Sequence, residues 1–140
     1  MLHAHPPAMN NPLLIYRTTA LSIDAATARL QEVSAAHKFG VQACHNLREK
    51  MEAKGVAFGR EVRVVEVCNP GHAAKVLAQD IEISTALPCR ISLYEEGGRT
   101  VLATMKPSAL LTMFAAPGAA ATAQEVETTL VRIMDETCAG

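Results

Sequence analysis

The chain has 140 residues, of which 49% are hydrophobic and 19% are charged, and its formal net charge is −1. This length fits one domain that buries about two thirds of its extended surface, so a packed core needs no disulfide bonds. A nearly neutral chain with no basic block, no Trp and 4% aromatic residues lacks the charge and the stacking side chains of a nucleic-acid-binding protein.

The N-terminal segment has no hydrophobic periodicity. It contains two prolines and two asparagines, so residues 1–11 are expected to form a flexible arm before a single domain over residues 12–140. The arm lacks the basic and apolar regions of a secretory signal, and no apolar run reaches the about 18 residues of a membrane helix. We therefore expect a cytoplasmic protein without a membrane partner, in which the four cysteines stay as thiols.

The domain begins with a predicted strand and helix. Residues 13–19 are apolar and β-prone, which predicts a strand. Ser22 then stands in the N-cap position of a helix, and Gly40 is expected to end it. The buried stripe of this helix is predicted to be Ile23, Ala26, Leu30, Val33 and His37.

Two further strand–helix pairs follow. Residues 41–44 form a short strand candidate, after which Asn46 begins a capping box for a short helix. Residues 62–68 are rich in β-branched side chains and predict a central strand. Asn69-Pro70 then predicts a helix start, because Asn caps well and Pro fits the first helical position.

The last third predicts a hairpin and a helix. Residues 89–94 and 100–105 flank a Gly-Gly turn, which is the clearest hairpin signal in the chain. Lys106-Pro107 is expected to end the second arm. Thr122 and Glu125 form a second capping box for a final amphipathic helix.

The predicted order is therefore β-α-β-α-β-α-β-β-α. The hairpin requires antiparallel pairing, so the fold class is α+β. We expect two layers, with a mostly antiparallel sheet of four to five strands and helices packed on one face. A doubly wound nucleotide-binding fold is a weaker alternative, because no glycine-rich strand-to-helix turn is present.

The first candidate site lies where the central strand meets its helix. Cys68 would stand beside a helix N-terminus, whose partial positive charge favours a thiolate. Free backbone N–H groups near His72 could hold an anion. Alternatively, Asn69 is only a helix cap and Cys68 packs as a small apolar side chain.

The second candidate site is Leu87-Pro88-Cys89-Arg90, at the start of the hairpin. Strand alternation predicts that Cys89 faces the core with Ile91, and that Arg90 lies on the opposite face. There Arg90 would bind a carboxylate or a phosphate, or remain solvated.

These landmarks together resemble the bacterial and archaeal proteins grouped as domain of unknown function 302. The resemblance covers residues 23–114 and implies a compact α+β fold related to the TATA-binding-protein-like arrangement, a homodimer, and no known activity. The chain departs from the pattern expected for this family at Cys44-His45 and in the alanine-rich segment 115–123. The residues that carry it are Glu66-Val-Cys-Asn-Pro70, Ala73, Ala74, Leu87-Pro-Cys-Arg90, Gly97-Gly98 and Lys106-Pro107.

The expected function is a non-enzymatic homodimeric module that binds a small anionic ligand or a partner protein. Its expected binding residues are Cys68, Asn69, His72, Cys89 and Arg90. No acid–base pair stands beside them, and the sequence indicates no catalytic residue, metal site or particular cofactor. The alternative is a thiol-redox or metal- or cofactor-dependent protein, which requires Cys68 and Cys89 to converge in the fold.

Overall fold

The computed structural model describes residues 9–140, so most of the predicted N-terminal arm lies outside the described residues. The strands are β1 (Leu14–Thr19), β2 (Gly40–Asn46), β3 (Val62–Cys68), β4 (Cys89–Glu96) and β5 (Arg99–Met105). The α-helices are α1 (Ile23–Ala36), α2 (Leu47–Ala53), α3 (Pro70–Gln79), α4 (Pro107–Leu110) and α5 (Ala120–Cys138). The 3₁₀ turns of residues 9–140 are η1 (Ile81–Ala86), η2 (Leu111–Met113) and η3 (Pro117–Ala119).

The strands form one five-stranded sheet in the order β1-β5-β4-β3-β2, and every neighbouring pair is antiparallel. The predicted α+β class and the predicted order of the main elements are confirmed. The hairpin turn is also as predicted. Gly97 and Gly98 have φ angles of 57° and 78°, the left-handed values that a two-residue turn between antiparallel strands requires.

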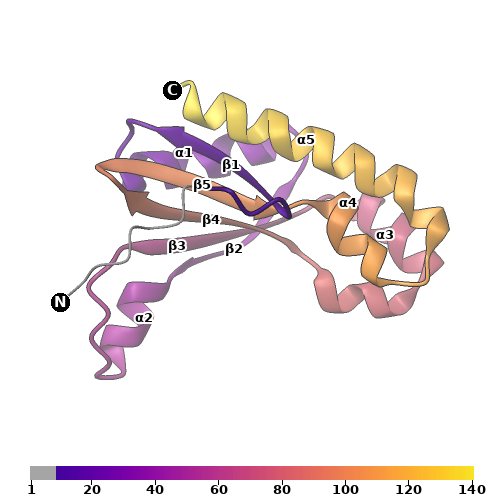
Figure 1. Ribbon diagram of the computed structural model, residues 1–140, viewed down its shortest axis with the longest axis horizontal. Helices are drawn as coiled ribbons and strands as arrows, with labels where there is room; N and C mark the ends of the chain where they lie inside the picture. The colour runs from indigo at the N-terminus through magenta and orange to yellow at the C-terminus, as the bar shows by residue number, and fades with distance from the viewer. Residues whose placement is uncertain (1–8) are drawn as a thin grey trace.

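The core lies between the sheet and two helices. In Figure 1, α1 and α5 lie together on one face of the sheet. Strand alternation sends one set of side chains to that face, and those at its centre are fully buried. This set includes Val65, Ile91, Leu93 and Leu102, all 0% exposed, which pack with Leu30 and Leu130 from the helices.

Three predicted helix starts are confirmed by their capping hydrogen bonds. Ser22 accepts from Ala25 N at 3.1 Å, and Asn46 accepts from Glu49 N at 3.0 Å. Asn69 accepts from His72 N at 3.0 Å, and Pro70 occupies the first position of α3. These side chains satisfy backbone N–H groups that have no partner within the helix.

The predicted end of the first helix at Gly40 is wrong. The helix ends at Ala36, Lys38 takes the left-handed conformation with φ 64°, and Gly40 is already the first residue of β2. This turn directs Phe39 into the core, where it is 1% exposed. Burial of that ring outweighs the preference of glycine for the left-handed position.

The capping box predicted at Thr122 is also wrong. The last helix begins at Ala120, directly after the 3₁₀ turn η3, and Thr122 is buried within it. Alanine favours the helical state, so the helix extends backward past the expected cap.

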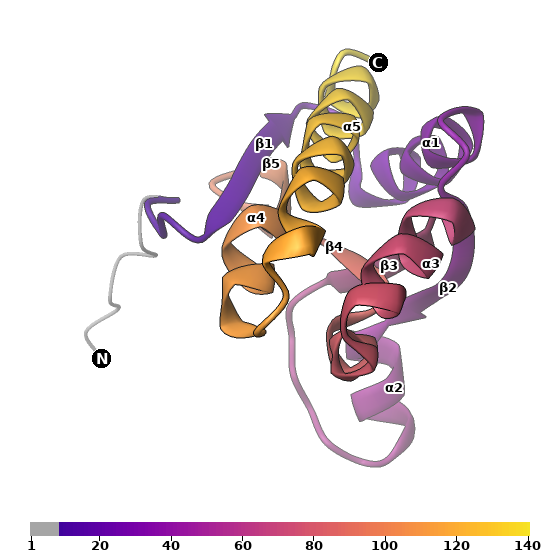
Figure 2. The same ribbon diagram turned by 90° about the vertical axis from the view of Figure 1, so that its right-hand side faces the viewer.

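One end of the sheet carries elements that the sequence pattern did not predict. The turn η1 follows α3, and α4 with η2 follows β5. Figure 2 shows α3 and α4 flanking this end of the sheet, with α5 above them. These short elements build the walls of the site described next.

Candidate functional site

The first wall of the site comes from the junction between β3 and α3. Asn69 holds this junction with both ends of its amide. Its oxygen caps α3, and its nitrogen donates to the carbonyl of Lys38 at 3.1 Å. One side chain therefore ties the start of α3 to the turn after α1.

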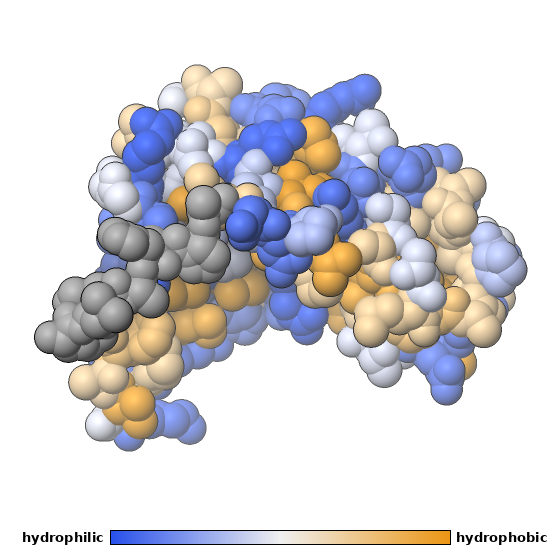
Figure 3. Space-filling model, in the orientation of Figure 1, coloured by the Kyte–Doolittle hydropathy of each residue, from blue (hydrophilic) through white to orange (hydrophobic). Residues whose placement is uncertain are grey.

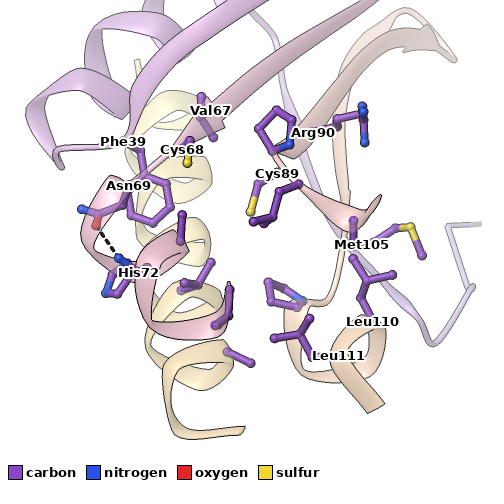
Figure 4. A pocket seen from close by; sticks show the side chains of 18 of the residues that line it. Phe39, Val67, Cys68, Asn69, His72, Cys89, Arg90, Met105, Leu110 and Leu111 are labelled. Carbon is purple, nitrogen blue, oxygen red and sulfur yellow. Dashed lines mark hydrogen bonds between the residues drawn. The ribbon is translucent and has the colours of Figure 1, made fainter. Parts of the chain in front are cut away.

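The second wall comes from the start of β4. Cys89 lies directly opposite Val67 on the neighbouring strand, so the Leu87–Arg90 segment begins beside the end of β3. The two motifs are separated in sequence but adjacent in the fold. All five candidate residues, Cys68, Asn69, His72, Cys89 and Arg90, line one pocket of about 130 Å³ (Figure 4).

Most of the pocket wall is apolar. Phe39 and Cys89 line it from different sides, and Val76 from α3 and Val126 from α5 add to it. Leu110 and Leu111 extend the wall on the side of α4. These residues were not predicted as site residues, because isolated apolar side chains carry no signal that separates a pocket wall from an ordinary core.

Arg90 does not direct its charge into the pocket. Its side chain points away from the hollow in Figure 4, and its Nε donates to Glu66 Oε2 at 3.2 Å. Glu66 also lies 3.5 Å from His45 Nε2. The predicted position of Arg90 on the face opposite Cys89 agrees with this geometry, but the guanidinium is paired rather than free.

The polar groups of the lining are already mostly engaged. Thr104 donates to the carbonyl of Arg90 at 2.8 Å. His72 Nε2 lies 3.4 Å from Glu125 Oε2, and its ring stands 5.9 Å from that of Phe39. Nδ1 of His72 is buried and has no hydrogen-bond partner within residues 9–140.

The predicted thiolate at Cys68 is not favoured by its surroundings. Burial raises the pKa of the Cys68 thiol above its usual value despite the nearby helix start. Burial, with a smaller effect from Cys68, raises the pKa of Cys89 to about 11. Loss of water around sulfur penalises the charged form, and here it outweighs the helix dipole.

The two cysteines do not form a bonded pair, and all four cysteines of the chain are free. Because Val67 is the residue opposite Cys89, strand alternation turns Cys68 toward the other face of the sheet. Both thiols contact the pocket, but the strands do not aim them at each other.

Two further observations concern the described part of the chain. Within residues 9–140, no three His, Cys, Asp or Glu side chains lie close enough together to hold a metal ion. No helix in the same range combines the length and apolar character needed to cross a bilayer.

The comparisons with known proteins agree on one family. Residues 15–137 match the family described as domain of unknown function DUF302. The chain is similar to the crystal structure of an uncharacterized conserved DUF302 protein from Bacillus stearothermophilus, with a TM-score of 0.85 and 29% sequence identity. That similarity covers 91% of this chain and 99% of the other. No curated protein matches the sequence.

Proposed function

Because the chain belongs to the DUF302 family, for which no activity is described, we propose its function from the pocket itself. The protein is a non-enzymatic homodimeric module that binds a small molecule in the hollow between α3, β4 and α4. The observation that carries this proposal is the convergence of two sequence motifs, at Cys68–Asn69 and Pro88–Arg90, on one pocket. Pockets that combine an apolar wall with a few polar groups are typical of ligand sites.

Binding rather than catalysis fits the chemistry of the lining. A nucleophilic cysteine needs a lowered pKa or an adjacent base, and burial raises the pKa of both pocket thiols. The carboxylate of Glu66 is paired with Arg90 on the face of the sheet opposite Cys89.

Ligand binding is tested by thermal unfolding with a panel of phosphates, carboxylates and neutral small molecules. A ligand that binds only the folded state raises the midpoint temperature with its concentration. We expect at least one class to do so, and amide chemical shifts to change in α3 and α4. A panel that leaves the midpoint and these shifts unchanged would contradict the proposal.

The homodimer is proposed to form through the face of the sheet opposite α1 and α5. One row across this face contains Tyr16, Ala103, Ser92, Val64 and His45, as the strand register gives. Apolar surface is visible beneath the sheet in Figure 3. The face also carries Glu66 beside Arg90, and a two-fold interface can use such opposite charges in both directions.

Light scattering after size-exclusion chromatography tests the dimer. We expect a dimer at micromolar concentration and a monomer for Val64→Lys, since the lysine would bring an added positive charge into a buried interface. Ala28→Lys, on the exposed side of α1, is the matched control and should remain dimeric. A monomeric native protein would overturn this part of the proposal.

A thiol-redox function is the second candidate, supported by the contact of both Cys68 and Cys89 with one pocket. In that case diamide, the oxidant, would accept two electrons and two protons as a Cys68–Cys89 disulfide forms. Mass spectrometry of the peptides would detect this bond. If diamide instead leaves both thiols free in the folded protein, the redox candidate is excluded.

A further inference from the structure

We propose that the pocket selects a compact, uncharged aromatic molecule, an inference that rests on the proposed binding function. Three features of the pocket indicate this ligand class: its size, the engagement of its polar groups, and the presence of a sulfur atom and an aromatic ring.

The size of the pocket sets the first limit. Its volume is about 130 Å³. An apolar cavity of about 150 Å³ in another protein stays dry and binds benzene, so a single ring is the largest rigid group that fits a space of this size. The pocket is partly open to solvent, so a larger ligand would place only one end group inside it and extend the rest beyond the walls.

The charge of the wall sets the second limit. Among residues 9–140, the only guanidinium in the wall belongs to Arg90, which points outward and is bonded to Glu66. The Asn69 amide uses both its oxygen and its nitrogen, and the Thr104 hydroxyl donates to a backbone carbonyl. Nδ1 of His72 is buried without a partner in residues 9–140, but the His72 ring lies on the side of α3 away from Cys89 in Figure 4. An ionic ligand beside Cys89 would therefore lose its hydration without gaining a partner, which disfavours phosphates and carboxylates.

The chemistry of the wall favours an aromatic ring over an aliphatic one. The Cys89 side chain points into the hollow, and the Phe39 ring lines it from another side (Figure 4). The soft, polarisable sulfur interacts well with the edge of a ring, and two rings pair well in offset or edge-to-face geometry. A saturated ring of the same size fills the space but gains neither contact.

Four probes of similar size separate these effects: benzyl alcohol, cyclohexylmethanol, benzoate and benzylamine. Titrations followed by amide chemical shifts give each dissociation constant directly. We expect benzyl alcohol to bind, cyclohexylmethanol to bind about twofold to tenfold more weakly, and the two ions at least about tenfold more weakly. Equal affinity for benzoate or for cyclohexylmethanol would overturn the inference.

Filling the pocket tests the location. Ala73→Leu on α3 should abolish binding of benzyl alcohol, and Ala123→Val on α5 serves as a second filling variant if the first fails to fold. Ala78→Leu, on the exposed side of α3, is the control and should bind like the native protein. Undiminished binding by a folded filling variant would overturn the assignment to this pocket.

The binding experiments distinguish a wrong ligand class from a pocket that binds no ligand. Binding of a phosphate or carboxylate in this pocket, without binding of benzyl alcohol, would overturn the ligand class and leave the binding function in place. If no compound in either panel changes the shifts of α3 and α4, both fail.

Discussion

At the scale of single residues, the stability of the pocket depends on groups whose partners are fixed by the fold. Asn69 ties the start of α3 to the turn after α1 through one amide, and the Cys89 thiol is mostly buried. Neither effect depends on a ligand, so both can be measured in the free protein.

Asn69→Ala should lower the free energy of unfolding by about 1–2 kcal/mol, because it removes the cap of α3 and the bond to Lys38. Urea unfolding measures this loss. Asn69→Asp keeps the capping oxygen and loses only the donor, so its cost should be smaller. Equal losses in both variants would assign the stabilisation to the bond with Lys38.

Cys89 should make the stability depend on pH in the alkaline range. The folded protein keeps the thiol protonated up to about pH 11, whereas an exposed thiol titrates near 9.0. Between these values the unfolded chain binds fewer protons, so the free energy of unfolding should fall as pH rises, by roughly 2–3 kcal/mol from this group.

Denaturant unfolding at several alkaline pH values checks this slope. Cys89→Ala should remove the contribution, and the difference between native protein and variant isolates it from other groups. Cys44→Ala, at an exposed cysteine on β2, should leave the slope unchanged. A slope in Cys89→Ala equal to that of the native protein would contradict the buried thiol.

At the scale of elements, α1 stabilises the end of α5 through one arginine. Arg29 donates from Nη2 to the carbonyl of Glu136 at 2.9 Å and from Nε to that of Thr137 at 3.2 Å. These carbonyls lie in the last turn of α5, where helical partners are missing and a positive charge is favourable.

Arg29→Ala should therefore destabilise the protein by about 1–2 kcal/mol and release the last turn of α5. Hydrogen exchange would show faster exchange in that turn than in the middle of the helix. Arg132→Ala changes an exposed arginine on α5 itself and serves as the control. If both variants behave alike, the carbonyl contacts of Arg29 contribute nothing measurable.

Most helix starts could be predicted from the sequence alone. Ser22, Asn46 and Asn69 were predictable caps, because each precedes an apolar stripe and acts on its own helix. Thr122 has the same local pattern, but the preceding turn and alanines extend α5 beyond it. Lys38 takes the strained backbone position ahead of Gly40, because Phe39 must reach the core.

At the scale of the whole molecule, the two faces of the sheet differ in what packs on them, because α1 and α5 lie on one face only. Val64 and Val65 are neighbours on β3 and point to opposite faces. Val65 is 0% exposed beneath the helices, whereas Val64 lies on the face proposed for the dimer. The same substitution at both positions therefore compares the two faces with one residue type.

Val65→Ala should lower the free energy of unfolding by about 2 kcal/mol at any protein concentration, because it removes two methyl groups from the fully buried core. Val64→Ala should lower the free energy of unfolding less in dilute solution, and progressively more as the protein concentration rises and dimers form. Unfolding measured over a range of protein concentrations distinguishes them. A cost for Val64→Ala that does not change with concentration would argue against an interface on this face.

The whole-molecule arrangement was only partly predictable. Hydrophobic alternation and the hairpin indicate the class of fold and the order of its elements. The position of Arg90 opposite Cys89 also follows from alternation. The pairing of Arg90 with Glu66 and the contributions of Leu110 and Leu111 to the pocket depend on contacts between distant segments. Local patterns do not encode those contacts.

The outer strand β2 has a consequence for solubility. In the described part of the chain β2 pairs only with β3, so its other side presents backbone groups that could template the growth of aggregates. The register shift between Val41 and Ala43 interrupts that row, and α2 begins directly after the strand ends. A foreign strand would therefore meet an irregular edge, which protects the protein from open-ended stacking.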